Sequence, residues 1–200
     1  MNINDYRTIY VLFPPLWGGN HFANMLSLSP KISNRNSAVT DNDYLKNIES
    51  YYDSQIKNAH IESNVSNVGI HLLDDVYQTI NASNKPFILA GHVDEAYFSF
   101  QKIKELGPIL CIVFSLIDAD KIKKREQKHV DGLSLFVYNE KIIKKIFNDD
   151  NIKIDTLGVD STELCIEDAS NLYQRFNTFL DLDLNLDLCS QLHKKWFNKI

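Results

Sequence analysis

The chain has little of several residue types, and each shortage excludes a class of protein. Its three cysteines, Cys111, Cys165 and Cys189, are odd in number and widely spaced, and no CxxC pair occurs. This usage excludes a dense disulfide framework and a zinc site built from cysteine pairs, and predicts reduced thiols in the core. No apolar run approaches the length of a membrane span, since the longest, such as residues 109–114, are far too short.

Arginine is also scarce, and acidic residues outnumber basic ones, 26 to 21. The formal net charge is −5, which argues against a general nucleic-acid binder. Arginine occurs at four positions only (Arg7, Arg35, Arg125 and Arg175), so an anion site has few bidentate groups to use. No HExxH or comparable spacing occurs, and no metal site is predicted. The first seven residues lack the basic-then-apolar order of a secretory leader, so the expected location is cytoplasmic.

What remains is the composition of an ordinary folded protein, with 44% apolar and 24% charged residues, and residues 1–200 are expected to form a single domain. Continuous apolar runs predict buried strands at 9–13, 87–90, 109–114 and 133–138, with a weaker one at 152–157. Helical periodicity occupies 20–28, 44–57, 68–80, 95–106, 119–128, 139–148, 167–180 and 186–199. Strands separated by helices predict an α/β fold, a mostly parallel sheet with helices on both faces.

Three segments between these elements are predicted to lack regular structure. Residues 29–43 and 62–67 are polar and predict loops. The first of them follows the helix at 20–28, and would be either a surface loop or a cover over a ligand. Residues 180–188 alternate leucine with polar residues, yet we interpret them as a linker into the last helix, whose apolar face carries Leu188, Leu192 and Trp196.

The most informative segment is the strand at 9–13 together with the turn and helix that follow it. The turn holds Gly18 and Gly19, and the helix begins at once, with Phe22, Met25 and Leu26 spaced for one face. A strand, a glycine turn and a helix present backbone N–H groups and a positive helix terminus to a phosphate-like anion. An ordinary strand-to-helix connection has the same pattern, so both interpretations stay open here.

Candidate catalytic residues follow the other strands, because open α/β sheets bind ligands beyond the carboxyl ends of their strands. His92 and Ser115 end the second and third runs, and in a parallel sheet they would lie near the glycine turn. His92 is the best candidate for a general base, since imidazole titrates near neutrality, and Asp94 or Glu95 would orient it. The alternative is a histidine that lines a helix entrance. His21 would meet an anion as imidazolium.

The basic run 121–128 and the remaining histidines are less specific. The run is either a solvated helix face or the source of Lys124 or Arg125 for a ligand phosphate. The other four histidines, at positions 60, 71, 129 and 193, are predicted to be structural or exposed.

In three segments taken in order, the chain resembles the sulfotransferase family, which has a P-loop-like α/β fold and uses the sulfate donor PAPS (3′-phosphoadenosine 5′-phosphosulfate). Residues 13–21, Phe-Pro-Pro-Leu-Trp-Gly-Gly-Asn-His, are similar to the loop for the donor's 5′-phosphosulfate. Residues 87–92, Phe-Ile-Leu-Ala-Gly-His, are similar to the strand that ends in the catalytic histidine. Residues 109–115 are similar to the strand and turn for the 3′-phosphate, and residues 159–182 to a later family segment.

The resemblance implies roles for particular residues. The donor's 5′ end would contact Trp17, Gly18, Gly19, Asn20 and His21. His92 would be the general base, and Ser115, Lys123 and Arg125 would lie at the 3′-phosphate. Two family residues are missing: the loop lysine falls near Pro15 or Leu16, and the strand-end arginine falls at Ser115. Loss of a preorganised cation typically costs on the order of a hundredfold in rate.

Two functions of different classes follow. The first is a sulfotransferase-like enzyme that moves a sulfuryl group from PAPS to the hydroxyl of a small-molecule or glycan acceptor, with no metal and no nucleic-acid partner. The alternative is a non-catalytic binding or interaction module on the same scaffold. A nucleotide kinase is excluded because no Gly-Lys pair occurs, and a hydrolase with a nucleophile elbow because G-x-S-x-G is missing.

Overall fold

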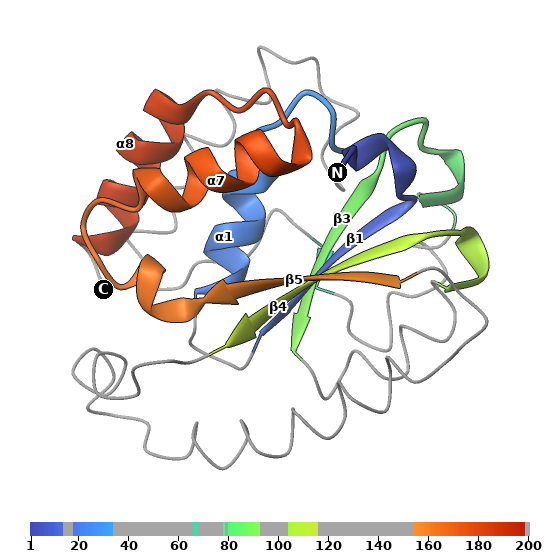
Figure 1. Ribbon diagram of the computed structural model, residues 1–200, viewed down its shortest axis with the longest axis horizontal. Coiled ribbons are helices and arrows are strands. Elements are labelled where there is room, and N and C mark those ends of the chain that lie inside the picture. The colour runs from blue at the N-terminus through green and yellow to red at the C-terminus, as the bar shows by residue number, and fades with distance from the viewer. Residues whose placement is uncertain are drawn as a thin grey trace.

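The computed structural model describes residues 1–13, 18–33, 66–67, 78, 80–92, 104–115 and 154–198. Its strands are β1 (Thr8–Phe13), β2 (Ser66–Asn67), β3 (Phe87–His92), β4 (Ile109–Ser115) and β5 (Ile154–Asp160). They form one sheet in the order β2-β3-β1-β4-β5, and every pair is parallel (Figure 1). The predicted α/β fold with a parallel sheet is confirmed.

Three described α-helices lie together on one side of this sheet (Figure 1). They are α1 (Gly19–Leu26), α7 (Ser170–Leu180) and α8 (Leu186–Phe197), and short 3₁₀ helices occupy Ile3–Asp5 (η1), Lys104–Leu106 (η3) and Ser161–Leu164 (η4). The predicted strand at 133–138 and helices at 44–57, 119–128 and 139–148 lie outside the described residues. Of the predicted helix 95–106 the structure describes only residues 104–106, which form the 3₁₀ helix η3.

The continuous apolar character of the strands reflects burial on both faces of the sheet. All six residues of β1 are buried. Ile9, Val11 and Phe13 belong to the core cluster with α1, α7 and α8, whereas Tyr10 is fully buried outside that cluster. Phe22 on α1 joins the layers, with its ring centroid 5.6 Å from Phe114 on β4. A strand buried on both faces needs no polar alternation, as the sequence pattern predicts.

Two segments predicted as loops pair with β3. Ser66 and Asn67 form β2, paired with Leu89 and Ala90, and a strand of two polar residues leaves no apolar run by which to predict it. Residues 29–33 begin the segment predicted to be either a surface loop or a cover over a ligand, and Ser33 forms a bridge with Phe87, the first residue of β3. The rest of that loop, residues 34–43, lies outside the described residues.

The alternating leucines after α7 belong to a linker, as predicted, and not to a strand. Leu180, Leu182 and Leu184 are all buried, while Asp181 and Asp183 have positive φ angles of 55° and 57°. Left-handed backbone at every second residue is incompatible with an extended strand and turns each leucine toward the core.

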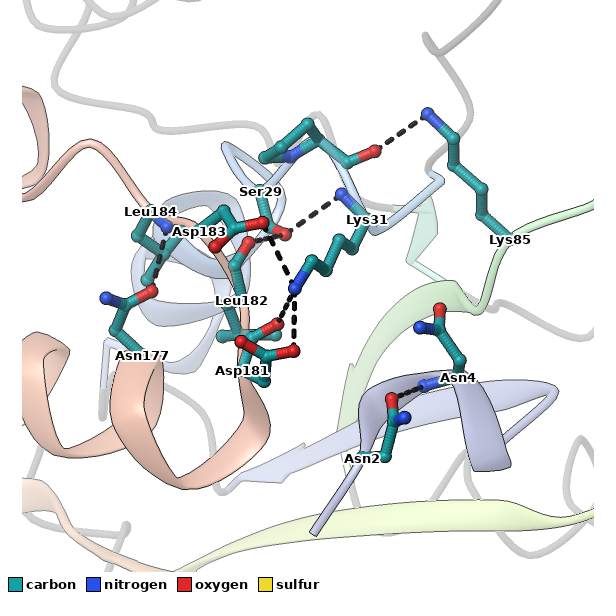
Figure 2. A network of polar contacts seen from close by, with 11 residues as sticks. Asn2, Asn4, Ser29, Lys31, Lys85, Asn177, Asp181, Leu182, Asp183 and Leu184 are labelled. Carbon is teal, nitrogen blue, oxygen red and sulfur yellow. Dashed lines mark hydrogen bonds and ion pairs between the residues drawn. The ribbon is translucent and has the colours of Figure 1, made fainter.

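Polar contacts join this linker to the segment after α1 (Figure 2). The Nζ of Lys31 lies 2.8 Å from Asp181 Oδ2 and 3.0 Å from Asp183 Oδ2. The hydroxyl of Ser29 donates to the carbonyl oxygen of Leu182. These contacts hold the C-terminal helices against the end of α1, and hydrogen bonds to Asp181 and then Asp183 raise the pKa of Lys31.

The cysteines occupy the positions expected of core thiols. Cys111 and Cys189 are buried, Cys165 is half-buried, and all three are free thiols. Burial raises the pKa of Cys189 to about 12 and also raises the pKa of Cys111.

The raised thiol pKa values predict a loss of stability in alkali. Below about pH 8.5 the thiols are protonated in both the folded and the unfolded chain, so they do not change the free energy of unfolding with pH. Above it the unfolded chain ionises while the folded protein does not, so by pH 10 each buried thiol should lower the free energy of unfolding by about 2 kcal/mol. Urea unfolding at pH 8 and pH 10 should show a smaller loss for C111A/C189A than for the wild type. Equal losses would contradict the prediction.

Candidate functional site

The carboxyl ends of the three central strands lie at one edge of the sheet. In the register of β1 and β3, Phe13 is opposite His92. In that of β1 and β4, Leu12 is opposite Val113, which leaves Ser115 just beyond the last residues of β1. Asp160, the last residue of β5, is opposite Ser115. The predicted convergence of the strand ends that carry His92 and Ser115 beside the glycine turn therefore holds for the backbone.

The order of the strands marks one position along this edge. The next described strand after β1 is β2, which lies beyond β3, whereas the next described strand after β4 is β5, on the opposite side. The strand order therefore reverses between β1 and β4. Such a reversal is the usual ligand position in open α/β sheets, beyond the carboxyl ends of the strands.

The glycine turn meets the edge at this same position. Gly18 has a left-handed φ of 75° and is the N-cap of α1, with no side-chain hydrogen bond to the cap. The first N–H groups of a helix have no partner within the helix, so in α1 they depend on groups outside it. Gly19 is required for packing, because a Cβ there would lie 2.0 Å from Cγ of Phe13.

His21 lies in the interior, with 2% of its surface exposed. Its Nε2 is 3.1 Å from Nδ1 of His193 and 3.2 Å from the hydroxyl oxygen of Tyr173. Its ring stacks on Trp196, with centroids 4.1 Å apart and planes 3° from parallel. Nε2 of His21 thus faces side chains of α7 and α8, and the contact of its imidazolium with an anion stays a prediction.

One carbonyl group fixes the direction of one hydrogen bond in this buried network. The Nε2–H of His193 donates to the carbonyl oxygen of Ile166 at 2.8 Å, because a carbonyl only accepts. A neutral His193 then offers Nδ1 as an acceptor for the hydroxyl of Tyr173, 3.0 Å away. Tyr173 can in turn accept from Nε2–H of His21, so the hydrogen bonds form one consistent chain. His193, predicted to be structural or exposed, is buried, with 1% of its surface exposed.

Two of the four arginines are engaged elsewhere. Arg7 precedes β1 at its amino end, and its guanidinium donates to the carbonyl oxygens of Ile80 and Ser83 at 2.6 and 2.5 Å. Arg175 on α7 pairs with both carboxylate oxygens of Glu163 at 2.8 and 2.9 Å, and hydrogen bonding to Glu163 raises the pKa of Arg175. Any arginine that contacts a ligand at the strand edge is therefore expected to be Arg35 or Arg125.

The structure describes only part of the predicted site. Gly18, Gly19 and the main chain of Asn20 form the start of α1, and the main chains of His92 and Ser115 end β3 and β4. The other predicted donor contacts, Trp17, Lys123 and Arg125, lie outside the described residues. Asp94 and Glu95, expected to orient His92, lie outside them as well.

Several residues at this end of the fold were not predicted as part of the site. Trp196, Tyr173 and His193 surround the start of α1, although they stand about 150 residues or more beyond it in the sequence. The helical spacing of Leu192 and Trp196 indicates a buried face but not the helix that it meets. Tyr10 is another: its hydroxyl lies within 2.8 Å of the place of a Cβ on Gly91, next to His92.

No protein-family model matches the chain, and a search of curated proteins finds no match. In the part of the chain that the structure describes, no helix has the length and apolarity needed to cross a membrane. Among those same residues, no group of three or more histidine, cysteine or acidic side chains is arranged to hold a metal ion.

Proposed function

We infer that the protein binds PAPS at the carboxyl edge of β1, β3 and β4 and transfers its sulfuryl group to an acceptor hydroxyl. The observation that carries this proposal is the meeting of three features at one edge: the glycine turn, the end of β3 at His92 and the end of β4 at Ser115. They coincide with the reversal of strand order, where α/β sheets bind ligands. A P-loop-like fold of the sulfotransferase kind would use this same edge.

The donor's 5′-phosphosulfate is expected at the start of α1. The N–H groups of Gly19, Asn20 and His21 lie in its first turn, and no side chain caps the helix at Gly18. Backbone N–H groups and the positive end of the helix dipole favour an anion here. Trp17, one residue before the cap, would flank the donor. The described part of the turn offers backbone N–H groups where the family has a lysine.

His92 is the proposed base. Its place opposite Phe13 puts it one strand away from the entrance to the turn. A neutral imidazole there would take the proton of an acceptor hydroxyl while that oxygen attacks sulfur. The bond from sulfur to the bridging oxygen breaks, and the electron pair leaves with the 5′-phosphate of the product PAP. As in phosphoryl transfer, alignment and charge stabilisation would be the main contributions of the protein.

The donor's 3′-phosphate is expected beyond β4. Ser115 ends that strand, and the basic run that begins six residues later carries Lys123 and Arg125. Because Arg7 and Arg175 are engaged in other contacts, Arg125 is our first choice for a bidentate phosphate contact. Arg35 is the other arginine that remains.

A non-catalytic module on the same scaffold is the second candidate. One observation favours it: Nε2 of His21, the histidine of the turn, is engaged by Tyr173 and His193 and is not directed at a donor phosphate in place of the missing loop lysine. Without a cation opposite the leaving phosphate, the site would bind an anion without accelerating its transfer. In that case PAP binds, but PAPS is not consumed in the presence of acceptor hydroxyl compounds.

Calorimetric titration with PAP, the desulfated product, tests the donor site and the choice of arginine. We expect micromolar binding to the wild type, weakened about tenfold or more in Arg125→Ala, because a charge-assisted bidentate contact is lost. ATP, which lacks the 3′-phosphate, should bind at least tenfold more weakly.

The matched control is Arg175→Ala, which removes an arginine that pairs with Glu163 on the surface. Its affinity for PAP should stay within twofold of the wild type. An equal loss in Arg125→Ala and Arg175→Ala would assign the effect to net charge and not to contact. No heat with millimolar PAP, and no shift of the unfolding temperature, would rule out the proposed donor site.

A further inference from the structure

Trp196, a residue of the last helix, packs against the first turn of α1. A Cβ on Gly18 would lie 3.1 Å from Cη2 and 3.2 Å from Cζ2 of the Trp196 ring. The face of the same ring stacks on His21, 4.1 Å away. Trp196 therefore touches both the cap residue and the third residue of α1, and only 3% of its surface is exposed.

The partner of this ring is itself fixed by hydrogen bonds. His21 is held by contacts with Tyr173 on α7 and His193 on α8, at 3.2 and 3.1 Å. His193 is anchored in turn to the carbonyl of Ile166, just before α7. These three buried side chains cannot rotate independently without breaking hydrogen bonds in the interior, which is costly. The stack of Trp196 on His21 is therefore a defined contact.

In the described part of the turn, no side-chain hydrogen bond fixes Gly18. This residue adopts a left-handed conformation and has no side chain. The direction of the first N–H groups of α1 then depends on what packs against Gly18 and His21. The nearest side chains to a Cβ on Gly18 are Trp196 and, at 3.5 Å, Leu164, while His21 contacts Trp196, Tyr173 and His193.

We propose that Trp196 is a positioning residue for the anion site at the start of α1, and that its contact with Gly18 and His21 sets the orientation of the N–H groups that bind the donor. This proposal rests on the proposed function, because it names the support of the same site. It extends the site from the glycine turn to the last helix, where no residue is predicted to act in binding. Trp196 acts through the backbone and touches no reacting atom.

Three variants test the proposal: Trp196→Ala, Trp196→Phe and Leu192→Ala. Leu192 is the matched control, because it is buried on the same helix one turn earlier and is not among the nearest neighbours of Gly18. Both alanine variants remove a large core side chain and lower overall stability. Only Trp196→Ala removes the support of the turn, and Trp196→Phe retains an aromatic ring against His21.

The first readout needs no ligand. The N–H of Phe22 donates to the carbonyl oxygen of Gly18 at 2.9 Å, so its hydrogen exchange reports the first turn of α1. Exchange at Phe22 should quicken at least tenfold more in Trp196→Ala than in Leu192→Ala, after each rate is referred to the global unfolding of that variant. Equal changes in the two variants would overturn the proposal.

The second readout is the affinity for PAP, measured by calorimetry. Trp196→Ala should bind at least tenfold more weakly than the wild type, Trp196→Phe should recover most of that loss, and Leu192→Ala should stay within twofold. A loss in Leu192→Ala as large as that in Trp196→Ala overturns the proposal. If the wild type itself fails to bind PAP, the proposed function falls, while the exchange at Phe22 still decides whether Trp196 holds the turn.

Discussion

Gly19→Ala is expected to destabilise the protein by about 3 kcal/mol or more, although the same change in an exposed helix stabilises by up to about 1 kcal/mol. The reason is steric. A Cβ at this position would lie 2.0 Å from Cγ and 2.1 Å from Cδ1 of Phe13. Phe13 ends β1 and is 2% exposed, so its ring has little room to move aside. Either the helix start or the strand end must shift.

Urea unfolding of the wild type and the variant measures this effect. Gly158→Ala is the matched control, because Gly158 lies in β5 and a Cβ there meets nothing within 4 Å. That change should alter the free energy of unfolding by no more than about 0.5 kcal/mol. If Gly19→Ala were neutral or stabilising, the packing of the turn on Phe13 described here would be wrong.

Phe22→Ala should lower the free energy of unfolding by a similar amount, about 3–5 kcal/mol, because it leaves a cavity between the sheet and the helices α1 and α7. The Phe22 ring is fully buried, and its centroid lies 5.0 Å from Phe176 and 6.3 Å from Tyr173 on α7, besides Phe114 on β4. For a chain of this length the unfolding temperature should fall by roughly 10 °C.

Thermal unfolding of Phe179→Ala provides the comparison. Phe179 also belongs to α7 but is 46% exposed, so its removal leaves no cavity. Its unfolding temperature should change by no more than about 2 °C. Similar losses in the two variants would show that α7 and α1 do not share the core cluster centred on Phe22.

Much of the sheet can be predicted from the sequence, because continuous apolar runs are a direct result of burial on both faces. The runs at 9–13, 87–90 and 109–114 are each found within one or two residues of the observed strands. The weaker run at 152–157 begins and ends two to three residues too early, since β5 is only half-buried along much of its length. β2 is missed because pairing of two polar residues leaves no pattern.

The candidate site is predictable in part, and for a related reason. Parallel strands place their carboxyl ends together, so the sequence alone assigns His92 and Ser115 to the edge of the sheet at which the glycine turn lies. The environment of His21 cannot. Its partners Tyr173 and His193 belong to helices that follow α1 in the sequence only after the other strands of the sheet. Helical periodicity predicts that these helices have a buried face, but it does not predict which residues that face contacts.

The central claim is that the donor's phosphates lie at the carboxyl edge of β1, β3 and β4, and chemical-shift mapping of the ¹⁵N-labelled protein with PAP tests it most directly. We predict the largest shifts at the amides of Gly19, Asn20 and His21, with further shifts at His92 and Ser115. Gly107, before β4 at the opposite edge, should not move. Shifts confined to that opposite edge, or none at saturating PAP, would contradict the account.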